Sequence, residues 1–184
     1  MISRTDAAIL GMLSIEPMSG YDMKKFSEQS LAHFWHESYG NLYPRLKRLE
    51  ANGMIRGRRE RRATAPDATV YRLTAAGKRR FREWLEEDPE PERIRNEMLL
   101  KVFFGAQASL ELCRDRIVAH RREQETTLER YRAIGDLAAG ADDRPDAVFW
   151  LMSLRRGILL TEARMRWCDE CIRTIDGLNA RGDE

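Results

Sequence analysis

SYGNLYPRLKRLEANGMI, residues 38–55, carries the strongest structural signal in the chain. Its leucines recur at i, i+4 and i+7, which predicts a short helix with one face in a hydrophobic core. These apolar positions are Leu42, Leu46 and Leu49. Asn41, Arg45 and Arg48 share the opposite side of the same helix. The stretch therefore predicts a helix that combines a core face with a basic face.

Both ends of this helix have local signals. Ser38 is a preferred N-cap residue, and Asn52-Gly53 provides the left-handed conformation that stops a helix. Pro44 lacks a backbone donor and would clash with the carbonyl four residues earlier in a helix interior. It is tolerated only if the regular helix starts near Leu42 or Tyr43, so we expect an irregular N-terminal turn.

Two further helices are predicted before this stretch. Thr5 or Asp6 is expected to cap the first helix, which Pro17 ends. Ser19, with Asp22 three residues on, forms an imperfect capping box that opens a second helix to about residue 31. The residues expected on the inner face of this second helix are Tyr21 and Phe26. Three helices within about fifty residues are typical of a helix-turn-helix.

A two-stranded wing is predicted after Gly53. Residues 54–59 (MIRGRR) begin a new apolar run, and residues 69–73 (TVYRL) alternate between apolar and polar side chains as a half-buried strand does. Thr74 is expected to cap a further helix that ends near Glu87. The residues expected to face inward on this helix are Phe81, Trp84 and Leu85. Residues 88–91 (DPEP) break it and mark the domain boundary.

The rest of the chain reads as helical, and we expect helices at residues 92–104, 109–138 and 144–178. The last helix carries an apolar seam with alternating steps of three and four residues. Its members are Leu151, Leu154, Ile158, Thr161, Met165, Cys168, Ile172 and Ile175. A seam of this kind packs against another long helix. We expect a second subunit to complete the core, which makes residues 92–178 a dimerisation domain.

Charge is concentrated in one part of the chain. The net charge is +2, yet residues 38–82 hold thirteen Lys/Arg against three Asp/Glu, a local excess of ten positive charges. Such a patch favours a polyanionic partner. The apolar runs at residues 7–15 and 148–154 are much shorter than the roughly 20 residues that span a bilayer. With three cysteines and no leader sequence, the chain is expected to be cytoplasmic.

Several motifs resemble PadR-type transcriptional regulators, in unbroken order over residues 5–88. These motifs are ILGML (9–13), MSGYD (18–22), FW (34–35), SYGNLYP (38–44), LKRLE (46–50), GMI (53–55) and VYRLTAAG (70–77). The resemblance implies a mainly α fold. Residues 1–88 would form a winged helix-turn-helix DNA-binding domain, and a long-helix dimerisation region would follow. It also implies a homodimer that binds operator DNA, generally as a repressor. In those members that respond to a small molecule or stress signal, the signal releases the protein from its operator.

Two groups of residues are the candidate DNA contacts. The first lies on the helix around residue 45 and comprises Ser38, Tyr39, Asn41, Tyr43, Arg45, Lys47 and Arg48. Asn pairs with adenine and Arg with guanine in the major groove, so Asn41 and Arg45 are candidate base readers. Tyr39, Lys47 and Arg48 are candidate phosphate contacts. Tyr39 or Tyr43 could instead belong to the core. The second group, on the wing, comprises Arg58, Arg59, Arg61 and Arg62. A solvated strand edge is the alternative for this group.

The cysteines and tryptophans predict no cofactor. Cys168 and Cys171 have CxxC spacing, but no second CxxC accompanies them and Cys168 lies on the apolar seam, which favours a packed cysteine over a metal or redox site. Trp150 and Trp167, with Trp35, could wall an aromatic effector pocket, although core packing is the simpler interpretation. The effector site is unknown from the sequence.

Two other classes of function are less compatible with this sequence than a DNA-binding regulator. A winged helix could dock a partner protein as an adaptor, but the local excess of positive charge argues against this alternative. An enzyme is disfavoured because the sequence has no phosphate loop, no nucleophile with a placed base and no carboxylate pair on a recognisable scaffold.

Overall fold

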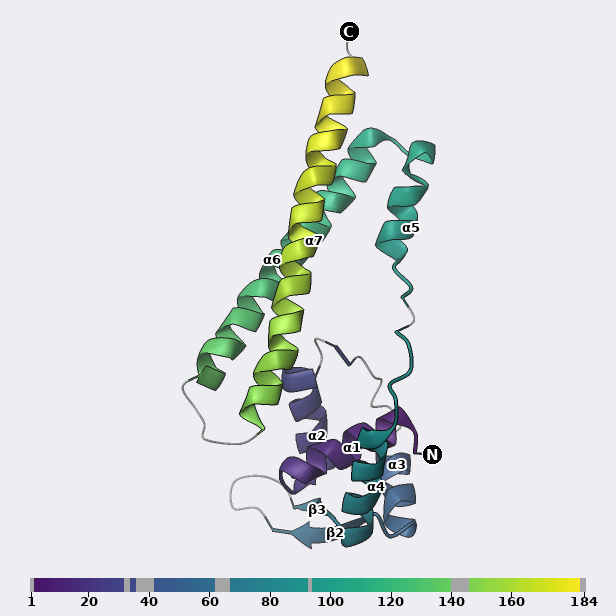
Figure 1. Cartoon of the computed structure of the whole chain (residues 1–184), viewed down its shortest axis with the longest axis vertical. Coiled ribbons are helices and arrows are strands. Elements are labelled where there is room, and N and C mark those ends of the chain that lie inside the picture. The colour runs from purple at the N-terminus through teal and green to yellow at the C-terminus, as the bar shows by residue number, and fades with distance from the viewer. Residues whose placement is uncertain are drawn as a thin grey trace. The chain divides into compact units, whose positions relative to one another are not determined.

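The computed structural model describes residues 2–31, 34–35, 42–61, 67–92, 94–139 and 146–182. It divides the chain into two units, Met1–Glu92 and Arg93–Glu184, each with its own internal contacts. Figure 1 shows a unit of short helices and strands and a unit made of helices alone.

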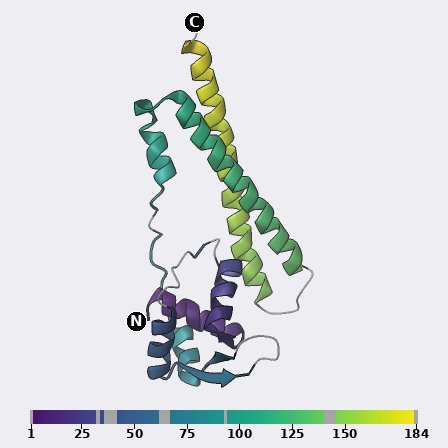
Figure 2. The same ribbon diagram turned by 180° about the vertical axis from the view of Figure 1, so that it is seen from behind.

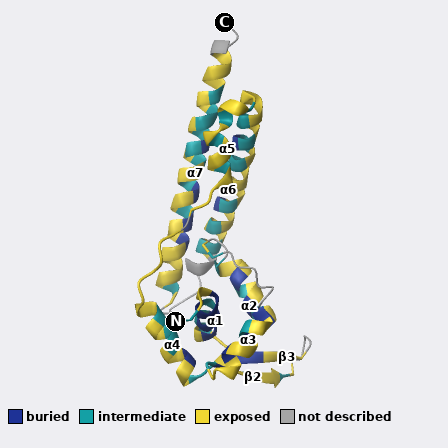
Figure 3. Cartoon of the chain, turned by 90° about the vertical axis from the view of Figure 1, so that its right-hand side faces the viewer, coloured by how far each residue is buried: buried dark blue, intermediate teal, exposed yellow. Residues whose placement is uncertain are grey.

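Helix α1 spans Arg4–Ile15 and lies at the centre of the N-terminal unit. Its N-cap is Ser3, whose Oγ accepts a hydrogen bond from the backbone N of Asp6 at 3.2 Å, so the expected cap at Thr5 or Asp6 was wrong. Both of those residues are instead buried in the first turn. Figure 3 shows how strongly the buried residues concentrate on α1.

Helix α2, Gly20–Phe26, begins with the predicted capping box between Ser19 and Asp22 and continues as a π-helical turn, η1, Ser27–Leu31. Phe26 packs against the core as expected. The inward position expected for Tyr21 was wrong, because its side chain is 68% exposed. Met23 is fully buried and lies about 200° further round the helix, which places Tyr21 on the outer side.

Helix α3 spans Leu42–Ala51, so Pro44 falls in its first turn, where a missing donor is tolerated. The predicted core face is confirmed, because all three leucines of this helix are buried. Gly53 has φ of 67°, which confirms the left-handed stop. The predicted cap, Ser38, lies outside the described residues.

The sheet has three antiparallel strands in the order β1-β3-β2, which are Met18–Ser19 (β1), Ala68–Leu73 (β3) and Ile55–Glu60 (β2). The two-stranded wing is confirmed as β2 and β3, seen as paired arrows in Figure 2. The third strand, β1, was not expected, because two residues are too few to show a strand pattern.

Helix α4, Ala75–Glu86, is capped by Thr74 as predicted and packs closely against the start of the wing. A Cβ atom at Gly77 would lie 2.1 Å from the carbonyl oxygen of Met54, so only glycine fits there. Phe81 packs on the core and stacks on Trp84 with ring centroids 6.0 Å apart. Leu85, which was expected to face inward, is exposed.

Three helices and a short 3₁₀ turn form the C-terminal unit. Helix α5, Glu97–Phe103, is capped by Asn96 and so begins five residues later than predicted. It is followed by the 3₁₀ turn η3, Gly105–Gln107, and by the long helices α6, Leu110–Ala139, and α7, Ala147–Gly182. Among the described residues, no helix has both the length and the apolar character needed to cross a membrane.

Helices α6 and α7 form an antiparallel hairpin (Figure 1). Ion pairs between the helices join later residues of α6 to earlier residues of α7, as expected for antiparallel helices. They are Arg114 Nε–Asp176 Oδ1 at 2.6 Å, Arg121 Nε–Asp169 Oδ1 at 2.6 Å and Arg132 Nη2–Glu162 Oε1 at 3.2 Å. The buried side chains at this contact are Ile117 and Leu128 of α6 and Leu154, Thr161 and Cys168 of α7. The predicted seam of α7 therefore packs against α6 of the same chain.

Candidate nucleic-acid interface

The outer side of α3 is polar and accessible. Lys47 is exposed, and Tyr43 is 61% exposed with its ring against Gly20, so Tyr43 is not a core residue. Ser38, Tyr39 and Asn41, three of the predicted DNA contacts, lie outside the described residues.

The two arginines of α3 contact an acidic residue that the sequence did not single out for this role. Nη1 of Arg45 donates to Oδ1 of Asp6 at 3.1 Å, and Nη2 of Arg48 donates to Oδ2 of Asp6 at 2.5 Å. Nη1 of Arg45 also donates to Oγ of Ser3 at 2.8 Å. The first turn of α1 therefore holds both guanidinium groups. No local sequence pattern indicates this contact, because the partners are about forty residues apart.

The strand register of the wing separates its arginines into two faces. Arg56 and Arg58 are two residues apart and therefore lie on the same face of β2. Arg72 of β3 pairs directly with Arg56 and lies on that face as well. Arg59 lies on the other face, with its side chain 82% exposed and 4.0 Å from Asp67. Two candidates, Arg56 and Arg72, were therefore missed, although cross-strand pairing with a known register would have found them.

The remaining predicted wing residues lie near the tip. Arg61 is exposed, and Arg62 lies outside the described residues. Arg72 forms an ion pair with Glu60 at 3.2 Å, whereas Arg56 and Arg58 are exposed side chains near the middle of β2.

One hydrogen bond joins α3 to the wing. Oε1 of Glu50, at the end of α3, accepts from the backbone N of Gly57 in β2 at 2.6 Å. Burial raises the pKa of the Tyr71 phenol beside this contact, and the charge of Glu50 raises it further. The basic surfaces of α3 and β2 are thus connected by a short, charge-assisted contact.

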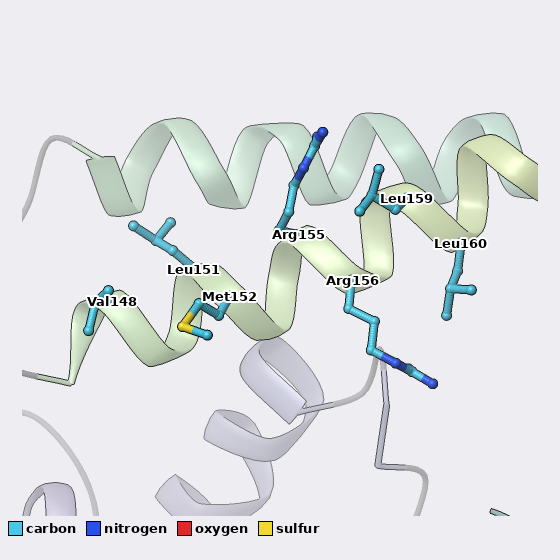
Figure 4. A pocket seen from close by; sticks show the side chains of 7 residues that line it. All are labelled: Val148, Leu151, Met152, Arg155, Arg156, Leu159 and Leu160. Carbon is cyan, nitrogen blue, oxygen red and sulfur yellow. The ribbon is translucent and has the colours of Figure 1, made fainter.

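An apolar surface on α7 lies on the side away from α6. A shallow hollow of about 660 Å³ lies at this surface. Figure 4 shows the side chains that line it in two rows. One row is Leu151, Arg155 and Leu159, and the other is Val148, Met152, Arg156 and Leu160. We call these seven residues the outer face of α7.

The residues predicted for dimerisation differ in their cover within the chain. Leu154 and Cys168 are buried against α6, and Ile158, Met165, Ile172 and Ile175 are half-buried. Leu151 is exposed and belongs to the outer face. Their assignment to an interface between subunits stays a prediction. The outer face is one apolar surface of α7 that α6 does not cover.

A second hollow, of about 630 Å³, lies among α5, η3, α6 and α7. Its lining includes Trp167, Cys113 and Cys171, with Glu170 and Thr174 as the polar groups. Trp150 is seventeen residues from Trp167, about 25 Å along a helix, so the two rings do not share a pocket within one chain.

The CxxC pair lies on α7 and is chemically quiet. Burial raises the pKa of both the Cys168 and the Cys171 thiol, which keeps them protonated and weakly nucleophilic. Both are free thiols. Within the described ranges, no group of three or more His, Cys, Asp or Glu side chains is arranged to hold a metal ion.

Two sequence families match this chain. The transcriptional regulator PadR-like family matches residues 9–83, and the family described as virulence activator alpha C-term matches residues 94–176. Together these matches cover both units of the structure.

Similar proteins give the same result over nearly the full length. The chain is 28% identical over 178 residues to the negative transcriptional regulator PadR of Bacillus subtilis, with 92% of this chain and 96% of the relative covered. A crystal structure of Bacillus subtilis PadR in complex with operator DNA matches with a TM-score of 0.82, 25% identity and coverage of 94% and 99%.

Another crystal structure, of Bacillus subtilis PadR in complex with p-coumaric acid, matches with a TM-score of 0.73 and 26% identity. It covers 93% of this chain and 98% of that one. The winged helix-turn-helix is thus found here with the same order of elements as in PadR and with the long helices that follow it. Residues 9–83 thus match the PadR-like family of transcriptional regulators, and the chain is similar to Bacillus subtilis PadR over nearly its full length.

Proposed function

We propose that this protein is a homodimeric, sequence-specific DNA-binding repressor that recognises an inverted-repeat operator. The observation that carries the proposal is the connected basic surface of α3 and β2. Lys47 and Arg48 are exposed on α3, Arg56 and Arg58 on β2, and the hydrogen bond from Gly57 to Glu50 fixes one element against the other. A helix in the major groove with a basic strand over the flanking phosphates is the expected geometry.

The relatives support the same chemistry. Bacillus subtilis PadR is described as a negative transcriptional regulator, and one of its structures contains operator DNA. We infer that the N-terminal unit binds DNA and that the C-terminal unit joins two subunits. We infer that the protein acts in the cytoplasm as a regulator and not as an enzyme.

A second copy of the chain covers the outer face of α7. Val148, Met152 and Leu159 are exposed there, with Leu151 and Leu160 beside them. A contiguous apolar surface of this kind marks an interaction site. Helix α5 also has exposed apolar side chains, which a partner surface would cover in the same way.

A small-molecule signal controls operator release. Another structure of the relative contains p-coumaric acid, and the hollow near Trp167 has the size of ordinary ligand sites. The identity of the signal is a separate question from operator binding, so the first experiment is carried out without an effector.

The experiment is a selection of duplexes from a random pool by the full-length protein. The enriched duplex and a scrambled control are then titrated by fluorescence anisotropy at several salt concentrations. An enriched inverted repeat bound roughly a thousandfold or more tighter than the scramble is the expected result. Equal binding to both duplexes would refute operator recognition, and no DNA binding with capture of acidic proteins would favour an adaptor.

The oligomeric state is tested with a matched pair of variants on α7. Leu159→Glu places a charge in the outer face, whereas Asn179→Glu places the same charge at an exposed polar position near the helix end. Light scattering is expected to show a dimer for the wild type and for Asn179→Glu and a monomer for Leu159→Glu. An unchanged dimer in Leu159→Glu would exclude this face as the interface.

A further inference from the structure

Asp6 lies at the point where α1 meets α3. Its side chain is only 6% exposed, and each of its two oxygens accepts a hydrogen bond from a different arginine. Oδ1 contacts Arg45 at 3.1 Å and Oδ2 contacts Arg48 at 2.5 Å. One buried carboxylate therefore serves two guanidinium groups of the helix that we assign to the DNA groove.

A buried carboxylate requires a positive partner. Desolvation makes an unpaired buried charge strongly unfavourable, whereas a charge that keeps one partner is tolerated. If both arginines left Asp6 to contact DNA, this charge would have no compensation. At least one guanidinium group must therefore stay with Asp6 in the DNA complex.

The two arginines differ in how firmly they are held. The Arg45 side chain is 27% exposed, and its Nη1 donates to both Asp6 and Ser3. The Arg48 side chain is 55% exposed, and its contact with Asp6 is made by Nη2. Arg45 is the more enclosed of the two, and it is tied to both polar groups at the start of α1.

Guanidinium chemistry allows Arg48 to contact two partners at once. An arginine has five N–H donors in a planar fork, so one nitrogen can remain on a carboxylate while others contact a phosphate or a base edge. The contact with Asp6 also restricts the rotamers of Arg48 before DNA arrives. This restriction lowers the entropy lost on binding.

We propose that Asp6 is a positioning residue that divides the roles of the two arginines. Arg45 is the permanent counter-ion that holds α3 on α1, and Arg48, oriented by Asp6, is the arginine that contacts DNA. This assignment rests on the proposed function, because it takes α3 to be the helix in the groove. It replaces the sequence-based expectation that Arg45 reads a base.

The test uses full-length Arg45→Ala and Arg48→Ala, with Arg173→Ala on α7 as an exposed control. Each is titrated at several salt concentrations with the duplex enriched from the random pool and with a scrambled duplex. Arg48→Ala is expected to reduce the slope of log K against log salt by about two, one for each subunit of the dimer, while Tm is kept. Arg45→Ala is expected to keep the slope and lower Tm, and adding Asp6→Asn to it should restore Tm. Arg173→Ala should change neither.

Asp6→Asn alone tests the positioning role. The neutral amide has the same shape but holds Arg48 less firmly and removes a negative charge near DNA. We expect tighter binding to the scrambled duplex and a lower ratio of specific to scrambled affinity. A purely structural contact would lower Tm without changing this ratio.

Two results would overturn the proposal. One is a slope that falls by about two in Arg45→Ala and stays constant in Arg48→Ala, and the other is an unchanged specificity ratio in folded Asp6→Asn. If Asp6→Asn fails to fold, the two alanine variants decide the outcome. If the wild type binds all duplexes equally, operator recognition fails, and with it the DNA role of Arg48. Restoration of Tm by Asp6→Asn would then test the counter-ion role of Arg45 by itself.

Discussion

Gly77→Ala should weaken the joint between α4 and the wing. The added Cβ would lie 2.1 Å from the carbonyl oxygen of Met54 and 3.0 Å from its carbonyl carbon. This oxygen is also held in place, because it accepts hydrogen bonds from the backbone N of Thr74 at 3.1 Å and from its Oγ1 at 3.0 Å. Relief of the overlap must therefore separate α4 from the start of β2.

The size of the effect follows from these contacts. Overpacking in a tight site costs about 1–3 kcal/mol. Weakening two hydrogen bonds adds about 1 kcal/mol each. We therefore expect the free energy of unfolding to fall by about 3–5 kcal/mol. A unit of this size should then lose roughly 12–40 °C in Tm. Operator affinity should fall as well, because β2 leads into the basic surface of the wing.

The assay is thermal unfolding followed by circular dichroism, with hydrogen exchange to locate the change. Protection should decrease in Met1–Glu92 and stay constant in α6 and α7. Gly177→Ala is the matched control, since no described atom lies within 4 Å of the position of its Cβ. It should stabilise α7 by up to about 1 kcal/mol. A Tm for Gly77→Ala equal to that of the wild type would refute the reasoning.

Three further predictions concern single contacts. Glu50→Ala removes the acceptor of Gly57 N, so we expect a loss of about 1–2 kcal/mol in urea unfolding, and weaker operator binding with an unchanged salt slope in anisotropy titrations. Arg58→Ala should reduce that slope by about two, one for each subunit of the dimer, whereas Arg59→Ala, on the other face of β2 and close to Asp67, should leave it unchanged; equal effects would contradict the assignment of faces. Cys168 is fully buried with a raised pKa, so alkylation followed by mass spectrometry should be at least about tenfold slower in the folded protein than in urea, and equal rates would show that the thiol is accessible.

Local chemistry was sufficient to predict most elements of the N-terminal unit. The capping box of Ser19 and Asp22, the position of Pro44 in a first turn and the glycine stop at Gly53 depend on residues at most four apart. Each was therefore readable from the sequence, as were the two strands of the wing. The family resemblance agreed with these elements and extended the prediction to DNA binding.

The errors came from choices that tertiary packing decides. Ser3 and Thr5 are both good caps, and the structure uses Ser3, which leaves Thr5 and Asp6 buried in the first turn of the helix. Tyr21 was placed inward because it is large and aromatic, but Met23 takes the core position. Periodicity correctly found the seam of α7 but carried no information on whether its partner was α6 or a second chain.

The sequence predicted which residues make up the candidate site but not which of them contact one another. The sequence indicated which helix and which strands carry the basic residues. It did not indicate that Asp6 holds Arg45 and Arg48, that Glu50 holds Gly57, or that Arg56 and Arg72 share a face with Arg58. These are long-range contacts or strand registers, which no single-sequence pattern encodes.

The two units differ in how much apolar surface they leave exposed. Among the described residues of the N-terminal unit, the exposed large apolar side chains are few, whereas those of the C-terminal unit are more numerous and include side chains of α5 and of the outer face of α7. A second copy that covers this face brings two basic surfaces together. Linked sites bind with an effective concentration far above that of free monomers. Leu159→Glu, which separates the subunits, should therefore lower operator affinity more than Arg48→Ala, which removes one contact per subunit. The opposite order in anisotropy titrations would mean that each winged helix binds DNA independently.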